Sequence, residues 1–332
     1  MRKFDEQKEL NSMNGALKLR PLINNFIDQI SERGYSNVCW LGIGGTYASS
    51  MQAVVHMKEK SAIETFVQNA AEYLVTGNKR ITKDTLIIIS SVTGSTQELV
   101  DSLKKIKNEV GATILAFLDI ANTPLEEIVD HVIVYPMNEQ LKFFMVADRL
   151  MYLANEFPDY DDFYKEMDQH FAKNIVAVAK KADQFGQEVA EKHHNDAMHY
   201  FVGAGNQWGA TYSHAMCYWE EQHWLRSKSI EAAEFFHGTL EVIDRDTAVT
   251  VYVGEDTQRP LSERVAKFLP QICGNYTIID TKDYELPGIS EKYRGNVSPF
   301  VFRAINNRID AYVEHLNRHP MTIRRYYRRL DY

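Results

Sequence analysis

Short runs of apolar residues recur in the first half of the chain, and segments with helical spacing separate them. The apolar runs have the length of strands and cover residues 37–44, 85–92, 112–119 and 131–137. The helical segments cover residues 47–59, 95–109 and 140–156. Continuously apolar strands that alternate with helices are typical of a parallel sheet buried on both faces. The pattern therefore predicts an α/β fold with helices on both sides of a sheet.

A second series of strands follows the polar run at residues 156–170. A long helical region, residues 161–195, leads into apolar runs at 198–205, 248–255 and 275–281. Ahead of the first strand, residues 17–33 have helical spacing, and Gly34 is expected to end that helix. We predict the following organisation: an N-terminal helical segment at 1–34, α/β domains at 35–175 and 176–316, and a C-terminal basic tail at 317–332.

The two halves of the chain also resemble each other in sequence. WLGIGGTYAS at 40–49 is similar to FVGAGNQWGA at 201–210, and NAAEYL at 69–74 is similar to EAAEFF at 231–236. Strand–glycine–helix corners look alike in many α/β proteins, but two similarities in the same order favour an internal duplication. The two copies need not both be active.

Composition and charge exclude several classes of protein. The chain has 332 residues, 45% of them hydrophobic, which is enough for two domains with their own cores. Its formal net charge of -8 disfavours nucleic acid or an anionic membrane as the main partner, because either would call for a basic face. The first residues lack the apolar core of a signal peptide, and no segment reaches the ~18 apolar residues of a membrane span. We therefore expect a cytoplasmic protein that binds neither nucleic acid nor membrane.

The cysteines and adjacent histidines do not predict a metal site. Cys39, Cys217 and Cys273 lie far apart without CxxC spacing, so neither a disulfide framework nor a zinc site is expected. His193 and His194 lie in a charged stretch that we interpret as solvated. We therefore expect no metal and no cofactor.

Two glycine-rich turns follow predicted strands, one in each half. GIGG at 42–45 begins like a dinucleotide-binding fingerprint, but Tyr47 occupies the position of the third glycine. In the second half, GAG at 203–205 is followed by Trp208 at that position. No GxxxxGK[ST] motif is present either, so the sequence does not support a nucleotide site.

Hydroxyl side chains cluster between the apolar run at 85–89 and the helix that follows. Residues 90–100 read SSVTGSTQELV. A strand that ends in small residues before a helix exposes free backbone N–H groups at a positive helix end, which suits an anion. Hydroxyls at such a turn add hydrogen-bond donors without adding charge. We therefore predict a phosphate site whose candidate ligands are Thr46, Ser91, Thr93, Ser95 and Thr96, with Gly94 allowing close approach and Gly44 and Gly45 as candidate substrate contacts. The alternative is that Ser95 or Thr96 merely caps the helix, which would explain one hydroxyl of the cluster.

The run from Ser91 to Thr96 fits the pattern S-x-[ST]-G-x-T, and it resembles the phosphosugar-binding turn of the sugar isomerase (SIS) domain family. The tandem arrangement resembles the isomerase half of glutamine-fructose-6-phosphate aminotransferase. It is more similar to bacterial deglycases that act on fructoselysine 6-phosphate, and this second similarity lies in residues 220–244, 255–265 and 317–332. The resemblance implies two tandem SIS domains, each a parallel sheet flanked by helices in a flavodoxin-like three-layer arrangement.

The resemblance also implies two catalytic residues. In the family, a glutamate late in the helix after the second glycine turn is the acid/base, and a histidine in an HG pair, contributed by the neighbouring subunit, assists ring opening. His237 matches the histidine, and Glu221 lies 16 residues before it and matches the glutamate. Counting forward from Gly203 favours Glu220 instead, so both glutamates stay open. His214, on the same helix, is a candidate lining residue or an interior histidine.

The implied activity is hydrolytic deglycation of a phosphorylated Amadori compound, such as fructoselysine 6-phosphate, to glucose 6-phosphate and lysine. The aminotransferases carry a Schiff-base lysine in their C-terminal tail, whereas the tail here reads RRYYRR at 324–329 and contains no lysine. Arginine cannot form an imine because it is permanently protonated. An arginine of this tail, with Arg325 as the candidate, could meet the phosphate or a carboxylate of the substrate. The family also implies a homodimer or higher homo-oligomer with a site shared between subunits.

Other functions remain open at this stage. They are a glucoselysine-6-phosphate deglycase, an amino-sugar-phosphate isomerase or deaminase, and a phosphosugar sensor without turnover. The sensor is disfavoured because no helix-turn-helix segment is recognisable and the net charge is negative.

Overall fold

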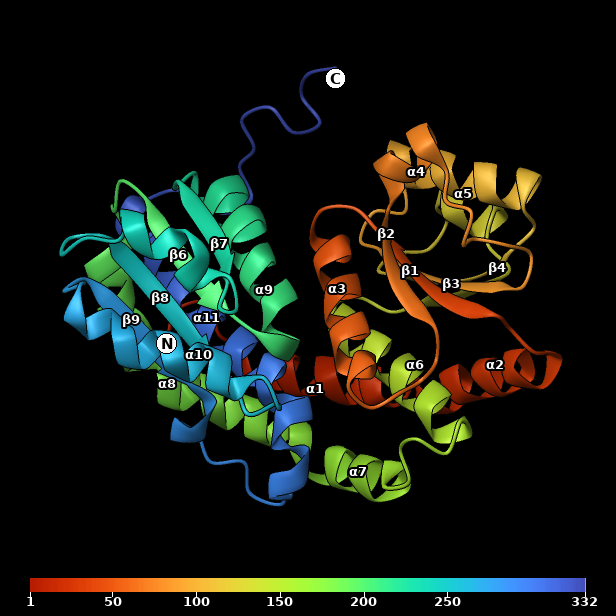
Figure 1. Cartoon of the computed structure of the whole chain (residues 1–332), viewed down its shortest axis with the longest axis horizontal. Helices are drawn as coiled ribbons and strands as arrows, with labels where there is room; N and C mark the ends of the chain where they lie inside the picture. Colours follow the sequence, from red (N-terminus) through yellow and green to blue (C-terminus); the bar gives the residue numbers. More distant parts are fainter. Residues whose placement is uncertain (332) are drawn as a thin grey trace. The chain divides into compact units, whose positions relative to one another are not determined.

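The structure is a computed structural model that describes residues 1–331 (Figure 1). It divides into two compact units. One comprises Lys8–Asp168, and the other comprises Met1–Gln7 together with the chain from Gln169 onward. Each unit contains one parallel sheet.

The first unit is built on a parallel sheet with strand order β2-β1-β3-β4-β5. Its strands are β1 (Asn37–Gly42), β2 (Thr65–Asn69), β3 (Thr85–Ser91), β4 (Thr113–Leu118) and β5 (His131–Val134). Trp40 in β1 lies beside Val67 of β2 and Ile88 of β3, which fixes the register at the centre of the sheet. Every residue of β1 and β3 is buried, as expected for central strands.

Helices cover both faces of this sheet. The helices between residues 6 and 166 are α1 (Glu6–Leu17), α2 (Arg20–Arg33), α3 (Gly45–Lys58), α4 (Ala70–Thr76), α5 (Gln97–Glu109), α6 (Glu139–Leu153) and α7 (Tyr160–Glu166). On one face, alternate strand residues such as Cys39 and Ile87 pack in a core with Leu103 of α5. On the other face, Trp40 contacts Phe143 of α6, with 5.1 Å between ring centroids. Figure 1 shows α4 and α5 on the side of the sheet away from α2 and α6. The predicted three-layer α/β/α arrangement is confirmed.

The second unit has the strand order β7-β6-β8-β9, again parallel throughout, which repeats the order β2-β1-β3-β4 of the first sheet without a fifth strand. Its strands are β6 (His199–Gly203), β7 (Ser227–Glu231), β8 (Ala248–Val253) and β9 (Tyr276–Asp280). Its longer helical segments are α8 (Ala172–His193), α9 (Trp208–Ser213), the π-helix η4 (His214–His223), α10 (Arg259–Phe268) and α11 (Arg294–Asn317). Val265 of α10 joins the core with Val251 of β8, whereas Phe302 of α11 packs on Tyr252 from the opposite face.

Some elements differ from the sequence prediction. The helix predicted at residues 17–33 is α2, which begins three residues later, at Arg20, with Pro21 in its first turn, where proline is tolerated. A separate helix, α1, precedes it and ends at Leu17. The edge strands β2 and β7 were missed. β2 alternates buried and partly exposed residues, and in β7 only Ser227 and Ile230 are buried, so both lack the continuous apolar run of a central strand. Among residues 1–331, no helix is both long and apolar enough to cross a lipid bilayer.

Candidate functional site

The carboxyl ends of β1 and β3 form the topological switch point of the first sheet. From β1 the chain crosses through α3 to β2, and from β3 it crosses through α5 to β4 on the other side. Ligands of open parallel α/β sheets bind at such a point. The predicted phosphate ligands fall at these two strand ends, because Thr46 follows β1 and residues 91–96 follow β3.

The turn after β3 is closed by a side-chain hydrogen bond and contains a glycine with positive φ. The buried Ser91 Oγ accepts a hydrogen bond of 2.9 Å from the backbone N–H of Gly94. Gly94 has a φ of 58°, and a Cβ there would lie 2.4 Å from Thr123 Cβ, so no other residue fits this position without strain. Thr96 is the N-cap residue of α5, but its side chain makes no capping hydrogen bond. The alternative interpretation, a simple helix cap by Thr96, is therefore not supported.

Thr46 helps to close the turn after β1. Its Oγ1 accepts a hydrogen bond of 3.1 Å from Ile43 N and donates one of 3.0 Å to Ile43 O. Its hydroxyl hydrogen is thus used inside the turn, so Thr46 shapes the site in this arrangement rather than offering a donor. Gly44 has a φ of 60°, and a Cβ there would meet no atom within 4 Å, which leaves open space above the turn.

A carboxyl group that sequence analysis missed lies beside this strand end. Glu139 is the first residue of α6, and it follows Met137 and Asn138, which have φ values of 62° and 54°. Non-glycine residues in this left-handed region are strained and concentrate at functional sites. Burial raises the pKa of Glu139, while the hydroxyls of Ser49 and Ser90 act in the opposite direction. Nothing in the local sequence separates Glu139 from an ordinary acidic residue in a first helical turn.

The equivalent point of the second sheet contains carboxylates where the first has hydroxyls. After β8, Asp256 Oδ2 accepts a hydrogen bond of 3.2 Å from Asn206 N in the turn after β6, and its Oδ1 accepts one of 2.9 Å from Gln258 N. A Cβ on Gly205 would lie 2.2 Å from Asp256 Oδ1, so the glycine is required for this approach. The carboxylate of Asp256 accepts hydrogen bonds from the backbone N–H groups of Asn206 and Gln258, which a bound anion would otherwise use. This second turn is therefore unsuited to a phosphate group.

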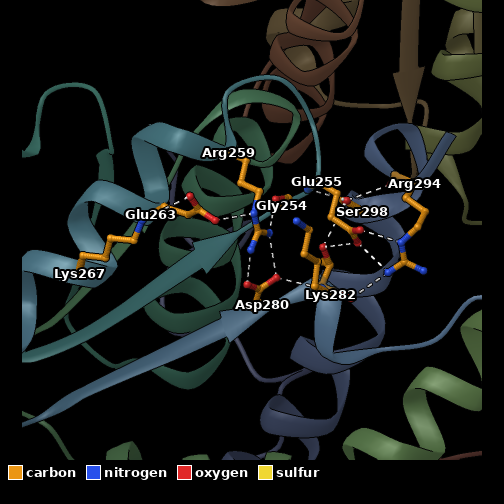
Figure 2. A network of polar contacts seen from close by, with 10 residues as sticks. Gly254, Glu255, Arg259, Glu263, Lys267, Asp280, Lys282, Arg294 and Ser298 are labelled. Atoms are coloured by element: carbon orange, nitrogen blue, oxygen red, sulfur yellow. Dashed lines mark hydrogen bonds and ion pairs between the residues drawn. The ribbon is translucent and has the colours of Figure 1, made fainter. Parts of the chain in front are cut away.

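A network of ion pairs closes the same edge of the second sheet (Figure 2). Arg294 on α11 donates to both oxygens of Glu255 at 2.7 and 2.8 Å, and Thr281 Oγ1 donates to Glu255 at 2.9 Å. Arg259 on α10 pairs with Asp280 at the end of β9. Bidentate ion pairs of this kind fix the orientation of both side chains. The charged groups drawn at this edge therefore already have partners within the protein.

Glu221 lies on a π-helix, a form that is rare and frequent at functional sites. The π-helix ends at Trp224, which has a φ of 59°. Glu221 is half-buried, and its Oε1 accepts a hydrogen bond of 2.8 Å from Arg324 Nε in the C-terminal tail. Glu220 is more exposed; partial desolvation raises its pKa, while Ser227 acts in the opposite direction. Of the two glutamates, Glu221 is thus the one that faces the tail.

The remaining predicted residues lie in different environments. His237 is exposed on the short 3-10 helix Phe235–His237, and among residues 1–331 its imidazole has no hydrogen-bond partner. His214 is only 3% exposed and packs edge-on against Phe201. Its predicted substrate contact therefore gains no support, because the ring lies inside the core. Arg325 stacks on the Trp224 ring, with 4.3 Å between the guanidinium and the ring centroid.

His193 is buried, contrary to the solvated position predicted from the sequence. Its Nδ1 and that of His199 lie 2.7 and 3.1 Å from Asp196 Oδ2. Burial acts to raise the pKa of Asp196, but hydrogen bonds from both imidazoles lower it to about 2. The three ligand atoms lie within 4.8 Å of one another and could hold a metal ion. Each ring nitrogen already has a partner, however, because the Nε2 atoms contact Thr277 and Thr250 at 2.9 Å.

The chain is similar to several known proteins. Residues 34–151 match the SIS domain family. The chain is 24% identical over 326 residues to the fructosamine deglycase FrlB of Bacillus subtilis (strain 168), covering 95% of this chain and 98% of the relative. It is 21% identical over 316 residues to the fructoselysine 6-phosphate deglycase of Escherichia coli (strain K12), covering 92% and 90%.

Solved structures show the same fold. A crystal structure described as a phosphosugar isomerase from Bacillus subtilis aligns with a TM-score of 0.88 at 22% identity, over 98% of this chain and 100% of that chain. The C-terminal domain of glucosamine-fructose-6-phosphate aminotransferase from Francisella tularensis aligns with a TM-score of 0.72 at 16% identity, over 95% and 96%. Residues 34–151 are therefore similar to the SIS domain family, and the hydroxyl-rich turn at residues 91–96 lies inside the matched residues.

Proposed function

We propose that the protein is a sugar-phosphate deglycase that hydrolyses fructoselysine 6-phosphate, or a close analogue, to glucose 6-phosphate and lysine. The observation that carries the proposal is the hydroxyl-lined turn at residues 91–96, which stands at the switch point of its sheet. The two curated relatives are named as deglycases, and each is matched over at least nine-tenths of both chains. Their names support a deglycase or phosphosugar isomerase, and the turn supports a phosphate monoester as the bound group.

In this proposal the backbone N–H groups at the start of α5 and the hydroxyls of Ser91 and Thr93 bind the phosphate. Uncharged donors at a positive helix end stabilise a dianion without forming an ion pair that would slow product release. The phosphate is on C6, so it anchors the sugar at the end opposite to the reacting carbons C1 and C2.

The chemistry then requires a proton carrier at C1 and C2. His237 assists opening of the sugar ring, and Glu221 removes a proton from C1 of the ketoamine. Return of a proton to C2 gives an aldimine between C1 and the amine. Water adds to C1, the C1–N bond breaks, and the amine leaves with a proton, which gives the aldose phosphate. The overall change is addition of one water molecule without oxidation.

His237 is exposed in its own unit, which suits the expectation that it serves the site of a neighbouring subunit. We therefore extend the proposal to a homodimer or higher homo-oligomer. Subunit mixing tests this part directly. Two inactive variants, one changed at Glu221 and one at His237, should regain activity when mixed if the two residues of one site come from different chains.

A coupled assay for glucose 6-phosphate tests the function. Fructoselysine 6-phosphate, glucoselysine 6-phosphate and glucosamine 6-phosphate are offered to the purified protein side by side. We expect turnover of the first compound to exceed that of the other two. Turnover of glucosamine 6-phosphate alone would replace the deglycase by an amino-sugar deaminase, and binding without any turnover would indicate a sensor.

A further inference from the structure

The C-terminal tail folds onto the end of the π-helix that carries Glu221. Arg318, with a φ of 50°, ends α11 and turns the chain back. His319 then packs on Trp224, with 4.2 Å between ring centroids, and Arg325 stacks on the same indole ring. These contacts hold the segment between them next to the candidate base.

Arg324 is the residue of this segment that reaches Glu221. Its Nε donates to Glu221 Oε1 at 2.8 Å, and its Nη1 donates to the carbonyl oxygens of Met321 and Ile323 at 2.6 and 3.1 Å. A guanidinium has five N–H groups, so three are used here. The two N–H groups of Nη2 meet no acceptor among residues 1–331.

This geometry is more than a surface ion pair. The side chain of Arg324 is only 24% exposed, and two backbone carbonyls fix the plane of its guanidinium beside the carboxylate. A planar group held in this way loses little conformational entropy when it binds a second anion. The unused edge of Arg324 is therefore a preorganised site for a carboxylate or phosphate oxygen.

The chemistry of the substrate decides which anion can reach it. Glu221 acts at C1 and C2 in the proposed reaction, whereas the phosphate is on C6 at the other end of the sugar. The amine is attached to C1, so the anion on that side of the sugar is the carboxylate of an amino acid, which in fructoselysine is joined to C1 through the flexible lysine side chain. We propose that Arg324 recognises the carboxylate of the amine portion of the substrate and so makes the enzyme selective for sugar phosphates linked to amino acids. This inference rests on the proposed function.

The experiment compares two substrates that differ only in that carboxylate. One is fructoselysine 6-phosphate, and the other carries 1,5-diaminopentane in place of lysine. The values of kcat/KM are measured for the wild type, for Arg324→Gln and for the matched control Arg329→Gln, which removes an exposed arginine of the same tail. Circular dichroism and thermal unfolding check that the variants fold.

A hydrogen bond between charged groups should favour the lysine compound in the wild type by roughly 10- to 100-fold in kcat/KM. We expect Arg324→Gln to bring this ratio close to one and Arg329→Gln to keep the wild-type ratio. A ratio that Arg324→Gln leaves unchanged, with both rates lowered equally, would show that Arg324 serves only Glu221 or the phosphate, and the inference would be wrong. If the wild type turns over neither compound, the proposed function itself fails, and this role of Arg324 fails with it.

Discussion

Asp310 Oδ1 on α11 lies 3.1 Å from His223 Nε2 at the end of the π-helix, and both side chains are buried. Asp310 Oδ2 lies 3.9 Å from Nδ1 of His214 at the start of the same π-helix. Burial lowers the pKa of His214, an effect that Asp310 opposes and His223 reinforces. One aspartate thus contacts both ends of the π-helix that carries Glu221, which makes Asp310 a positioning residue for that glutamate.

Replacing Asp310 tests this connection. We expect Asp310→Ala to lower the free energy of unfolding by about 3 kcal/mol, because removing one partner leaves a buried polar group unpaired. Asp310→Asn retains an oxygen that can accept from His223 and should cost less. Denaturant unfolding measures both, and kcat should fall more than KM rises if the π-helix positions Glu221. A loss below about 1 kcal/mol in Asp310→Ala would contradict the assignment.

The geometry of the turn after β3 predicts the effect of replacing Gly94. Gly94→Ala places a methyl group 2.4 Å from Thr123 at a φ of 58°, so it adds a steric clash to backbone strain. We expect it to lower the free energy of unfolding by about 2–3 kcal/mol and to weaken binding of glucose 6-phosphate. Calorimetric titration measures the affinity.

Gly111→Ala is the matched control. Gly111 has a φ of 78°, but an added Cβ meets no atom within 4 Å. The control should therefore cost only the backbone strain of about 1 kcal/mol and leave phosphosugar affinity unchanged. If the two substitutions changed phosphosugar affinity equally, the turn after β3 would not be part of the phosphate site.

The sequence predicted the strands that form runs of apolar residues, including the central strand β3 and the edge strands β5 and β9. The edge strands β2 and β7 were missed because polar residues interrupt each of them. The candidate phosphate turn could be proposed from the sequence because its hydroxyls lie close together along the chain. Glu139 and Arg324 could not be singled out, because their surroundings depend on contacts between segments far apart in the chain.

We predict different effects on kcat for substitutions of the two adjacent glutamates, Glu220 and Glu221. We expect Glu221→Gln to lower kcat by roughly 100-fold or more while ligand affinity changes little, because glutamine keeps the shape but cannot accept a proton. Glu220→Gln should stay within a few-fold of the wild type, since Glu220 is exposed and lies away from the tail contact. Initial rates and calorimetric binding separate the two effects. The reverse order of kcat values would transfer the role to Glu220.

Acid should weaken the second unit through the buried cluster of His199, His193 and Asp196. Burial lowers the pKa of His199 from 6.5 to about 4, although its hydrogen bond to Asp196 acts in the opposite direction. Between pH 6.5 and 4 the imidazole of His199 is protonated in the unfolded chain but stays neutral in the folded protein. The free energy of unfolding therefore falls as the pH drops through this range. The pKa of Asp196 is lowered from 3.8 to about 2, so its contribution is present above pH 3.8 and is lost below it.

The expected loss is about 1.4 kcal/mol per pH unit for the one proton of His199, or about 3 kcal/mol in total between pH 6.5 and 4. Urea unfolding at half-unit steps of pH measures it. His199→Asn can still bond Asp196 but does not titrate, so its free energy of unfolding should fall less steeply over the same window. If wild type and variant have the same slope, the acid sensitivity arises elsewhere, and His199 is not the group that titrates.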